Sequence, residues 1–280
     1  MRRRKARVAR APRGARARGP RTLAIDIGGT HLKASVLDAF GREIAKRVEV
    51  ATPQPAPPEA VLRRLKALAH PLPAYDRVSV GFPGVVDHGR IRTAPNLGTP
   101  AWRDFALAAE LKRVFGKPAR VLNDAEVQAL GVIKGGGLEC VVTLGTGFGS
   151  ALFRDGELMP HLELGQHPIA KGKTYDRYLG SAALKRKGAA KWNRRVARMI
   201  RVVRTLLNFD RLYIGGGDAG HVTIALPRDV TIVSNEAGIT GGVRLWKPAL
   251  DRFFAEPKRR KGPRNRAGRR RRTNRAAIGG

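Results

Sequence analysis

The feature that most constrains the fold of this chain is a short acidic turn with two adjacent glycines, Asp26-Ile27-Gly28-Gly29-Thr30. An apolar run precedes it and an alternating segment, Leu32 to Leu37, follows it, so the pattern predicts a strand, a turn and a second strand. Adjacent glycines have no Cβ atoms, so their backbone N–H groups can approach phosphate oxygens, and an acid beside them can manage a hydrated metal ion. A simple hairpin turn explains the same residues.

The pattern recurs once, 117 positions later. This shift places Val141 to Gly147 on Ala24 to Thr30, and a further strand is predicted at Ser150 to Phe153. Short glycine motifs can align by accident, but each copy here begins a half of ordinary domain size. We therefore predict an N-terminal lobe at 22–136 and a C-terminal lobe at 137–256. Glycine turns that face each other across such lobes would border a cleft for a phosphate chain.

Hydrophobic periodicity predicts an α/β fold. Apolar stripes and alternation predict a three-strand meander and then strands and helices in turn, which indicates a mixed sheet flanked by helices. The remaining predicted strands are 77–82, 119–122, 211–214 and 229–233, after meander strands at 22–27, 32–37 and 43–50. The predicted helices are 59–69, 105–115 with Asp104 as its cap, 125–133, 175–185, 191–207 and a closing helix at 241–254.

Both ends of the chain are strongly basic. Residues 1–21 and 257–280 contain 21 Lys and Arg residues and no acid, within a chain of net charge +33. Such runs cannot bury enough apolar surface to offset their ordering entropy, so both tails are predicted to be disordered. The residues between them keep an excess of 12 positive charges. A field of this sign attracts polyanions such as nucleic acid, polyphosphate or anionic membrane, and the tails are candidates for non-specific binding of this kind.

Cysteine content and hydropathy indicate the compartment. The single cysteine, Cys140, excludes an internal disulfide and a thiolate zinc cluster, which fits a reducing environment. No apolar stretch is long enough to span a membrane, and the basic N-terminus lacks a signal-peptide core. We expect a cytoplasmic protein.

Several short motifs support a family resemblance. They occur in the family's order between about residues 22 and 246: Asp26 to Thr30 with Lys33, Gly81 to Asp87, Ala94 to Leu97, Leu122 to Ala125, Leu144 to Gly149, Glu163 to Gly165, and Ile214 to Gly217. With these motifs the chain resembles the sugar kinases of the ROK family, and among them most closely the polyphosphate glucokinases. The resemblance implies a two-lobed, actin-like (ribonuclease H-like) kinase fold with a central cleft, and a homodimer is expected only from the family.

Asp124 is the candidate catalytic residue. An acid at the carboxyl end of a strand lies at a cleft edge, where it can accept a proton from a sugar hydroxyl that attacks phosphorus. By pattern alone, Asn123-Asp124 is also a helix cap. The resemblance implies that Asp124 is the base and that Asn123 holds sugar hydroxyls. It also nominates Asn96, Glu163, Gln166 and Asp176 for the sugar, although a turn residue and a solvated acid are the ordinary explanations of Asn96 and Glu163.

Two departures from the family pattern affect the sugar end of the site. Gln166 stands where many members have a histidine, and no cysteine cluster is present, so no zinc is expected. Asp176 stands where the family usually has glutamate, which shortens the reach of its carboxylate. The choice of glucose over mannose or another hexose therefore stays open.

The donor end of the site is assigned to the glycine turns. Gly28, Gly29, Thr30 and Lys33 from one lobe and Gly145, Thr146 and Gly147 from the other are expected to bind phosphate, with Mg²⁺ held indirectly near Asp26. Gly215 to Gly217 would border an adenosine in an ATP user, with Gly215 and Gly216 as further phosphate-binding candidates, or simply form a strand-to-helix turn.

The choice of donor depends on charge. Residues 171–211 contain 13 basic and two acidic residues, which suits polyphosphate as well as an ordinary solvated helix face. Polyphosphate, with ATP as a further donor, is the first hypothesis, and ATP alone is the second. A sugar-responsive DNA-binding regulator is the alternative from another class, but 21 residues rich in Arg, Ala, Gly and Pro are not expected to form its helix-turn-helix.

Overall fold

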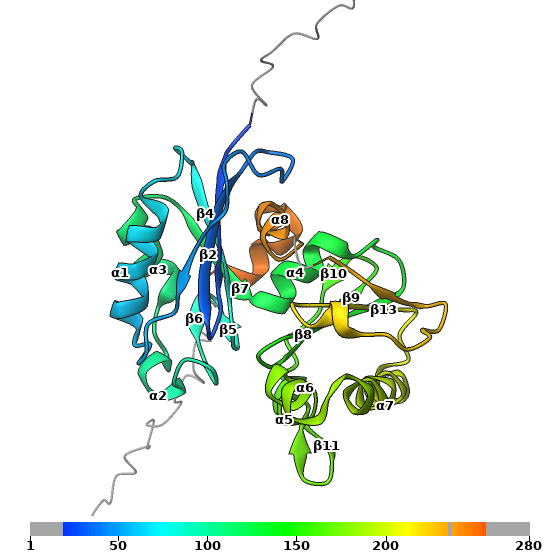
Figure 1. Cartoon of the computed structure of the whole chain (residues 1–280). Helices are drawn as coiled ribbons and strands as arrows, with labels where there is room; N and C mark the ends of the chain where they lie inside the picture. Colours follow the sequence, from blue (N-terminus) through cyan, green and yellow to red (C-terminus); the bar gives the residue numbers. More distant parts are fainter. Residues whose placement is uncertain (1–18, 235–236, 256–280) are drawn as a thin grey trace, which may run out of the picture.

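The computed structural model describes residues 19–234 and 237–255, which form two five-stranded sheets with helices between and around them (Figure 1). The predicted tails therefore lie outside the described residues, except for residues 19–21. None of the helices in the described part of the chain combines the length and apolar character needed to cross a membrane.

Sheet 1 has the strand order β3-β2-β1-β4-β7. Its hairpin strands are antiparallel, whereas β1, β4 and β7 run parallel. The strands are β1 (Thr22–Ile27), β2 (His31–Leu37), β3 (Val48–Ala51), β4 (Arg77–Phe82) and β7 (Ala119–Asn123). Helices α1 (Pro58–Ala69) and α3 (Leu107–Phe115) bury their apolar stripes against its outer face, near the short α2 (Thr99–Trp102) and the hairpin β5 (Val86–Asp87) and β6 (Arg90–Ile91).

Sheet 2 repeats this arrangement in the order β10-β9-β8-β13-β14. Its strands are β8 (Leu138–Leu144), β9 (Phe148–Arg154), β10 (Glu157–Leu158), β13 (Arg211–Gly215) and β14 (Val230–Ile232). A shift of 117 residues carries β2 onto β9 at both ends, so the repeat in the sequence corresponds to a repeat in topology. The shared order places the two glycine turns at equivalent strand ends.

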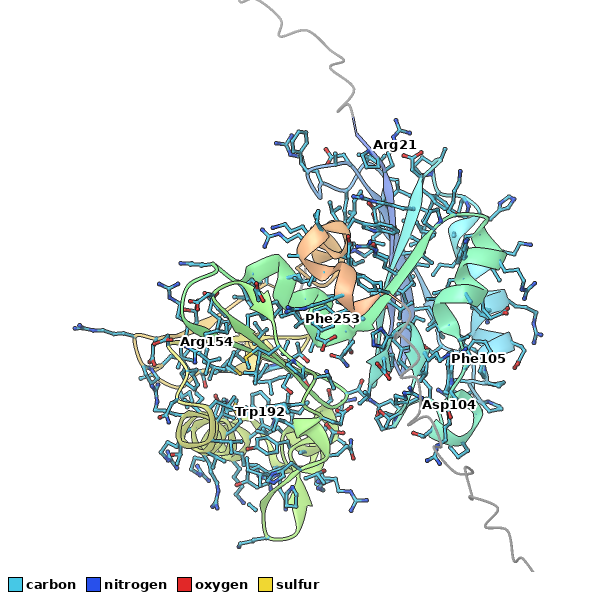
Figure 2. The ribbon with its side chains drawn as sticks, turned by 180° about the vertical axis from the view of Figure 1, so that it is seen from behind. Arg21, Asp104, Phe105, Arg154, Trp192 and Phe253 are labelled. Atoms are coloured by element: carbon cyan, nitrogen blue, oxygen red, sulfur yellow. The ribbon has the colours of Figure 1, made fainter. Side chains whose placement is uncertain are left out.

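The outer face of sheet 2 is covered by α5 (Tyr175–Leu179), α6 (Ser181–Lys187) and α7 (Ala189–Leu207). Trp192 of α7 is fully buried there and its indole donates to the carbonyl of Leu179 at 2.6 Å, whereas Arg154 at the end of β9 is exposed (Figure 2). The remaining elements of this half are η1 (Leu164–Gln166), the hairpin β11 (Pro168–Ala170) and β12 (Lys173–Thr174), and η2 (Ala219–His221).

Helix α4 (Asp124–Val132) lies between the sheets and packs against both (Figure 1). The C-terminal elements α8 (Ala237–Thr240), η3 (Gly241–Trp246) and η4 (Pro248–Phe253) follow sheet 2 in the chain. Even so, α8 and η3 pack on α4 and on β1, and Ser79 of β4 donates to the carbonyl of Gly242 at 2.7 Å. The predicted lobe boundary between residues 136 and 137 falls in the loop between α4 and β8.

Two predicted elements of the first half were wrong in detail. The strand predicted at 43–50 is regular only over β3: before it, pairing is limited to an isolated bridge between Glu43 and Leu37, and the carbonyl of Ala45 accepts from the Ser35 hydroxyl. The cap predicted at Asp104 is also wrong: the N-cap of α3 is Ala106. Asp104 instead has a left-handed backbone, φ 58°, and pairs with Arg92.

Two predicted helices of the second half were wrong in detail. The helix predicted at 175–185 is divided into α5 and α6 at Gly180, where the chain turns extended and a Cβ atom would lie 2.6 Å from the Thr146 carbonyl oxygen. The closing helix predicted at 241–254 is two 3-10 segments, η3 and η4, separated at Lys247 and Pro248. Proline lacks the N–H group that a continuous helix needs at that point.

Candidate functional site

A cleft of about 440 Å³ lies between the two halves, and all but two of the predicted site residues line it. Both glycine turns, the first residue of α4 and the loops after β4 and β10 contribute to its wall. The exceptions are Gln166 and Gly215. Gln166 is exposed and its amide donates to Asp176 at 2.7 Å, while a Cβ atom on Gly215 would lie 2.7 Å from Gln128 Nε2.

The end of β7 and the start of α4 place Asp124 in the cleft. Asn123 caps the helix: its side-chain oxygen accepts from the Ala125 N–H group at 2.9 Å, and Glu126 Oε2 accepts from the Asn123 N–H group at 3.1 Å. The amide of Asn123 also donates to the carbonyl of Gly84 at 3.1 Å. The cap suggested by the sequence is thus present, and it fixes Asp124 between the Pro83-Gly84 loop and the second half.

Asp124 has an unusually high pKa. Burial is the largest cause and the negative charge of Asp26 the next, and Glu163 adds to them, whereas the Ala125 N–H group and His161 act in the opposite direction. Together they raise the pKa of Asp124 to about 7. A carboxylate with a pKa near neutral pH can both take up and release a proton, which is what a general base requires.

The two glycine turns present free donors to the cleft. Each turn closes on itself, because the Gly28 N–H group donates to His31 O at 2.9 Å and the Gly145 N–H group donates to Gly147 O at 3.1 Å. Within residues 19–234 and 237–255, the N–H groups of the next residues, Gly29 and Thr146, have no acceptor. Unpaired N–H groups at the edge of a polar cleft suit the oxygen atoms of a phosphate.

The first turn lies in a mixed-charge environment. Burial raises the pKa of Asp26 despite the opposing positive charges of Lys33 and Arg47, and Glu49 reinforces the increase. The sequence analysis missed Arg47, which lines the cleft and pairs with Glu43. No strand periodicity could reveal it, because Arg47 reaches the cleft only where the predicted strand gives way to a loop.

The sugar candidates surround Asp124 from both halves. Asn96 lies against the first turn, since a Cβ atom on Gly29 would approach Asn96 Cβ to 3.0 Å. Asp176 is tied to its own half: its carboxylate accepts from the Phe148 N–H group at 2.7 Å and from Gln166 at 2.7 Å. Burial is the first cause that raises the pKa of Asp176, and these hydrogen bonds oppose it in part.

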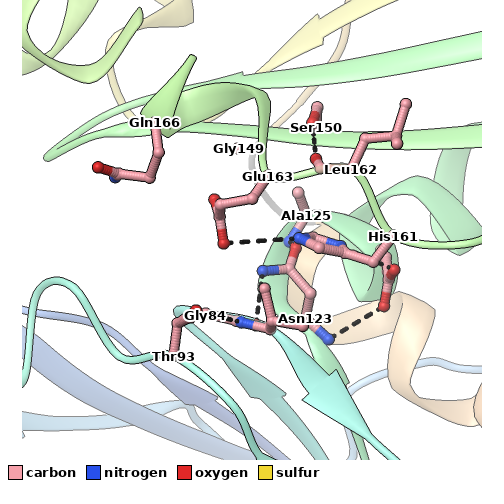
Figure 3. A network of polar contacts seen from close by, with 12 residues as sticks. Gly84, Thr93, Asn123, Ala125, Gly149, Ser150, His161, Leu162, Glu163 and Gln166 are labelled. Carbon is pink, nitrogen blue, oxygen red and sulfur yellow. Dashed lines mark hydrogen bonds and ion pairs between the residues drawn. The ribbon is translucent and has the colours of Figure 1, made fainter. Parts of the chain in front are cut away.

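Glu163 is backed by residues that the sequence analysis did not identify. His161 lies between Glu163 and Glu126, and these three side chains form a polar network with Asn123 (Figure 3). The only sequence signal for it is the spacing His-x-Glu beside the Glu163 motif, and its partner Glu126 is 35 residues away.

The opposite end of the cleft is formed by the turn after β13. Gly216, with φ 89°, lines the cleft where a Cβ atom would lie 2.3 Å from the Leu144 carbonyl oxygen. Asp218 accepts from the Ser181 hydroxyl at 2.5 Å, and both residues line the cleft. Gln128 is buried there, and its Nε2 atom has no partner within the described residues.

Comparisons with known proteins identify relatives of this chain. The chain is 33% identical to the polyphosphate glucokinase of Mycobacterium tuberculosis over 69% of this chain and 76% of that protein. The structure is similar to an inorganic polyphosphate/ATP-glucomannokinase from Arthrobacter sp. strain KM, with a TM-score of 0.73 and 31% identity over 81% of this chain and 98% of that one.

A further structure shares the fold alone. It is a ROK family glucokinase from Streptomyces griseus in complex with glucose and AMPPNP, with a TM-score of 0.68 at 20% identity over 80% of this chain and 98% of that one. The model of the ROK family matches residues 22–165, which include both glycine turns, Asp124 and Glu163. With its two-sheet, actin-like fold and this match over half its length, the chain belongs to the ROK family.

Proposed function

We propose that this protein is a sugar kinase that transfers the terminal phosphoryl group of inorganic polyphosphate, with ATP as a further donor, to the 6-hydroxyl of glucose. The observation that carries the proposal is the position of Asp124, whose pKa is raised to about 7, in one cleft with the free N–H groups of both glycine turns. The similarity to a polyphosphate glucokinase and to a polyphosphate/ATP-glucomannokinase supports the choice of substrates.

In the proposed reaction, the sugar hydroxyl gives its proton to the Asp124 carboxylate while its oxygen attacks the terminal phosphorus atom. The bond from that phosphorus to the bridging oxygen breaks, and the shortened donor leaves with the electron pair. Such a base contributes about a hundredfold to ten-thousandfold to the rate. Asn96, Glu163 and Asp176 would hold the other hydroxyls, because a polyol needs convergent carboxylates and amides.

Asp26 would hold Mg²⁺ indirectly, through bound water and phosphate, beside the first glycine turn. Its carboxylate lines the cleft, and carboxylate oxygen is a donor that Mg²⁺ prefers. Within the described residues no three His, Cys, Asp or Glu side chains gather as a metal cluster, so phosphates and water would supply most of the ligands. When bound, the ion would neutralise charge that develops on the transferred group.

The reason to prefer polyphosphate is a basic layer on the outer face of sheet 2, made of exposed Lys and Arg residues of α6 and α7. Helix α6 begins at Ser181, which lines the cleft, and its last turn carries Lys185, Arg186 and Lys187, all exposed. Exposed bases of α7, Lys191, Arg194 and Arg198, continue from there. None of these six residues is in an ion pair with a described acid, so their charges are available to a long anion. The charge of Arg204 is not available in this way, because Arg204 pairs with Asp229 at 2.6 Å.

The deciding experiment measures initial rates of glucose 6-phosphate formation with glucose, Mg²⁺ and either ATP or long-chain polyphosphate. Activity with polyphosphate is expected. Activity with ATP alone would support a sugar kinase but reject polyphosphate as its donor. Preference for another hexose would change only the proposed acceptor. No activity with either donor on any hexose would overturn the kinase and leave a sugar-binding regulator.

A further inference from the structure

His161 lies behind the cleft wall, outside the set of residues that line it. It comes from the segment between β10 and η1, and 11% of its side chain is exposed. Each ring nitrogen faces a carboxylate: Nδ1 is 3.0 Å from Glu126 Oε1, and Nε2 is 3.6 Å from Glu163 Oε2 (Figure 3). A histidine that carries both ring protons is positively charged and can donate to an acid on each side, so it can bridge the two carboxylates.

Glu126 connects this bridge to the helix that carries Asp124. It is the third residue of α4, only 6% of its side chain is exposed, and its second oxygen accepts from the Asn123 N–H group at 3.1 Å. Burial opposes protonation of His161, but the contact with Glu126 and the nearby negative charges of Glu126 and Glu163 outweigh it and raise the pKa of His161 to about 9. The network therefore joins the start of α4 to a residue of the opposite cleft wall.

The contact from His161 to Glu163 is incomplete. At 3.6 Å the His161 Nε2 and Glu163 Oε2 atoms are too far apart for a good hydrogen bond. Both atoms are buried, and neither has a hydrogen-bond partner among the described residues. Glu163 also lines the cleft, so a ligand there could shift its carboxylate by the few tenths of an ångström that would close the bond. Glu126, in contrast, is fixed on a helix and already bonded through both oxygens.

We infer that His161 is a positioning residue: as an imidazolium held by Glu126, it completes a hydrogen bond to Glu163 when sugar enters the cleft and offsets the charge of Glu163 near Asp124. This inference rests on the proposed function and deepens it. The charged groups that act on Asp124 are Asp26, Glu163 and His161, and only His161 favours the ionised base. Glu126 and Glu163 are the charged groups that face His161.

The first test needs no activity. In an NMR titration of the full chain, the His161 imidazole should stay protonated at pH 8, where an ordinary exposed histidine is neutral. Glu126→Gln keeps a side chain that can cap α4 but removes the charge, so the His161 signal should titrate at lower pH. A His161 that titrates near an ordinary value of about 6.5 in the wild-type protein would overturn the inference, whether or not the protein is a kinase.

The second test is kinetic and uses His161→Gln, which supplies one neutral donor in place of a charged bridge. The KM for glucose should rise about tenfold, because Glu163 loses a charge-assisted hydrogen bond. Since the positive charge near Asp124 is also lost, kcat at pH 6.5 should fall at least about threefold more than kcat at pH 8.5.

The control is His167→Gln, an exposed histidine of the same segment, which should leave both values unchanged. Circular dichroism should show every variant folded. Equal losses of kcat at both pH values, with an unchanged KM, would mean that His161 only supports the fold. Inactive wild-type protein would count against the proposed kinase. The NMR titration would still show whether His161 is the charged link between Glu126 and Glu163.

Discussion

The two halves of the molecule have the same strand order but different chemistry at equivalent places. The turn after β1 lies beside Asp26, Lys33 and Arg47, with Asp124 close by at the start of α4. The equivalent turn after β8 has one acid against it, Asp176, which accepts from the Phe148 N–H group, and the basic α6 begins beside it at Ser181. A duplicated scaffold thus supplies two similar glycine turns, and the residues around each turn differ.

The outer helices differ in the same way. α1 on sheet 1 and α6 on sheet 2 both carry three exposed bases, but only α6 starts at the cleft. We interpret the first half as the half that carries the base, and the second as the half that extends the donor site beyond the cleft.

Removal of the base should have the largest effect. Asp124→Asn keeps the size of the side chain but cannot accept a proton, so kcat should fall about a hundredfold to ten-thousandfold with either donor. Steady-state rates of glucose phosphorylation measure it, and Asp104→Asn, at an exposed acid paired with Arg92, is the control. A loss of less than tenfold would place the base elsewhere and break the assignment of chemistry to the first half.

The pH dependence should follow from the same residue. Because the pKa of Asp124 is raised to about 7, kcat with saturating glucose should fall about tenfold per pH unit below that value as the carboxylate takes up its proton. The fall of kcat at low pH should be the same with ATP and with polyphosphate if the base acts on the sugar and not on the donor. A rate that stays constant down to pH 5.5 would contradict the raised pKa.

The donor side is tested by a matched pair of triple variants. Lys185→Gln/Arg186→Gln/Lys187→Gln on α6 should raise the KM for long-chain polyphosphate about tenfold and that for ATP by less than about twofold, because only the long anion extends along the helix. Arg63→Gln/Arg64→Gln/Lys66→Gln on α1 removes the same charge from the other half. Equal effects of both variants would mean that the bases of α6 attract polyphosphate only through general electrostatics and do not form a binding track.

Much of the site was predictable because its residues lie in local motifs. The glycine turns at 28–30 and 145–147 follow strands whose alternation is visible in the sequence, and Asp124 ends a predicted strand. Gln166 was harder to place: it is in the 3-10 turn η1 and donates to Asp176, but it is not among the residues that line the cleft.

The residues that sequence reasoning missed depend on contacts between distant segments. His161 gains its role from Glu126, and Arg47 reaches the cleft only because the chain leaves the sheet before β3. The split of the helix predicted at 175–185 has a similar origin, since it depends on the carbonyl of Thr146. Helical periodicity describes one segment at a time, so it cannot report such contacts.

The smallest predicted effect is on stability, and it has the opposite sign to the effect on activity. A carboxyl group with a pKa raised in the folded state ionises less readily there than in the unfolded chain, so Asp124 costs stability once the pH rises above its unfolded pKa of about 4. The cost grows until the folded pKa of about 7 is passed.

Asp124→Asn should therefore raise the free energy of unfolding at pH 8 by on the order of 1 kcal/mol, a few degrees in Tm, and have little effect at pH 4. Thermal unfolding of both proteins at the two pH values measures the difference. Asp251→Asn on η4, an exposed acid that pairs with the largely buried Arg120, should show no such gain. A more stable but inactive Asp124→Asn would indicate that the first half gives up stability to hold its base, whereas lower stability at pH 8 would mean that Asp124 mainly serves the fold at the start of α4.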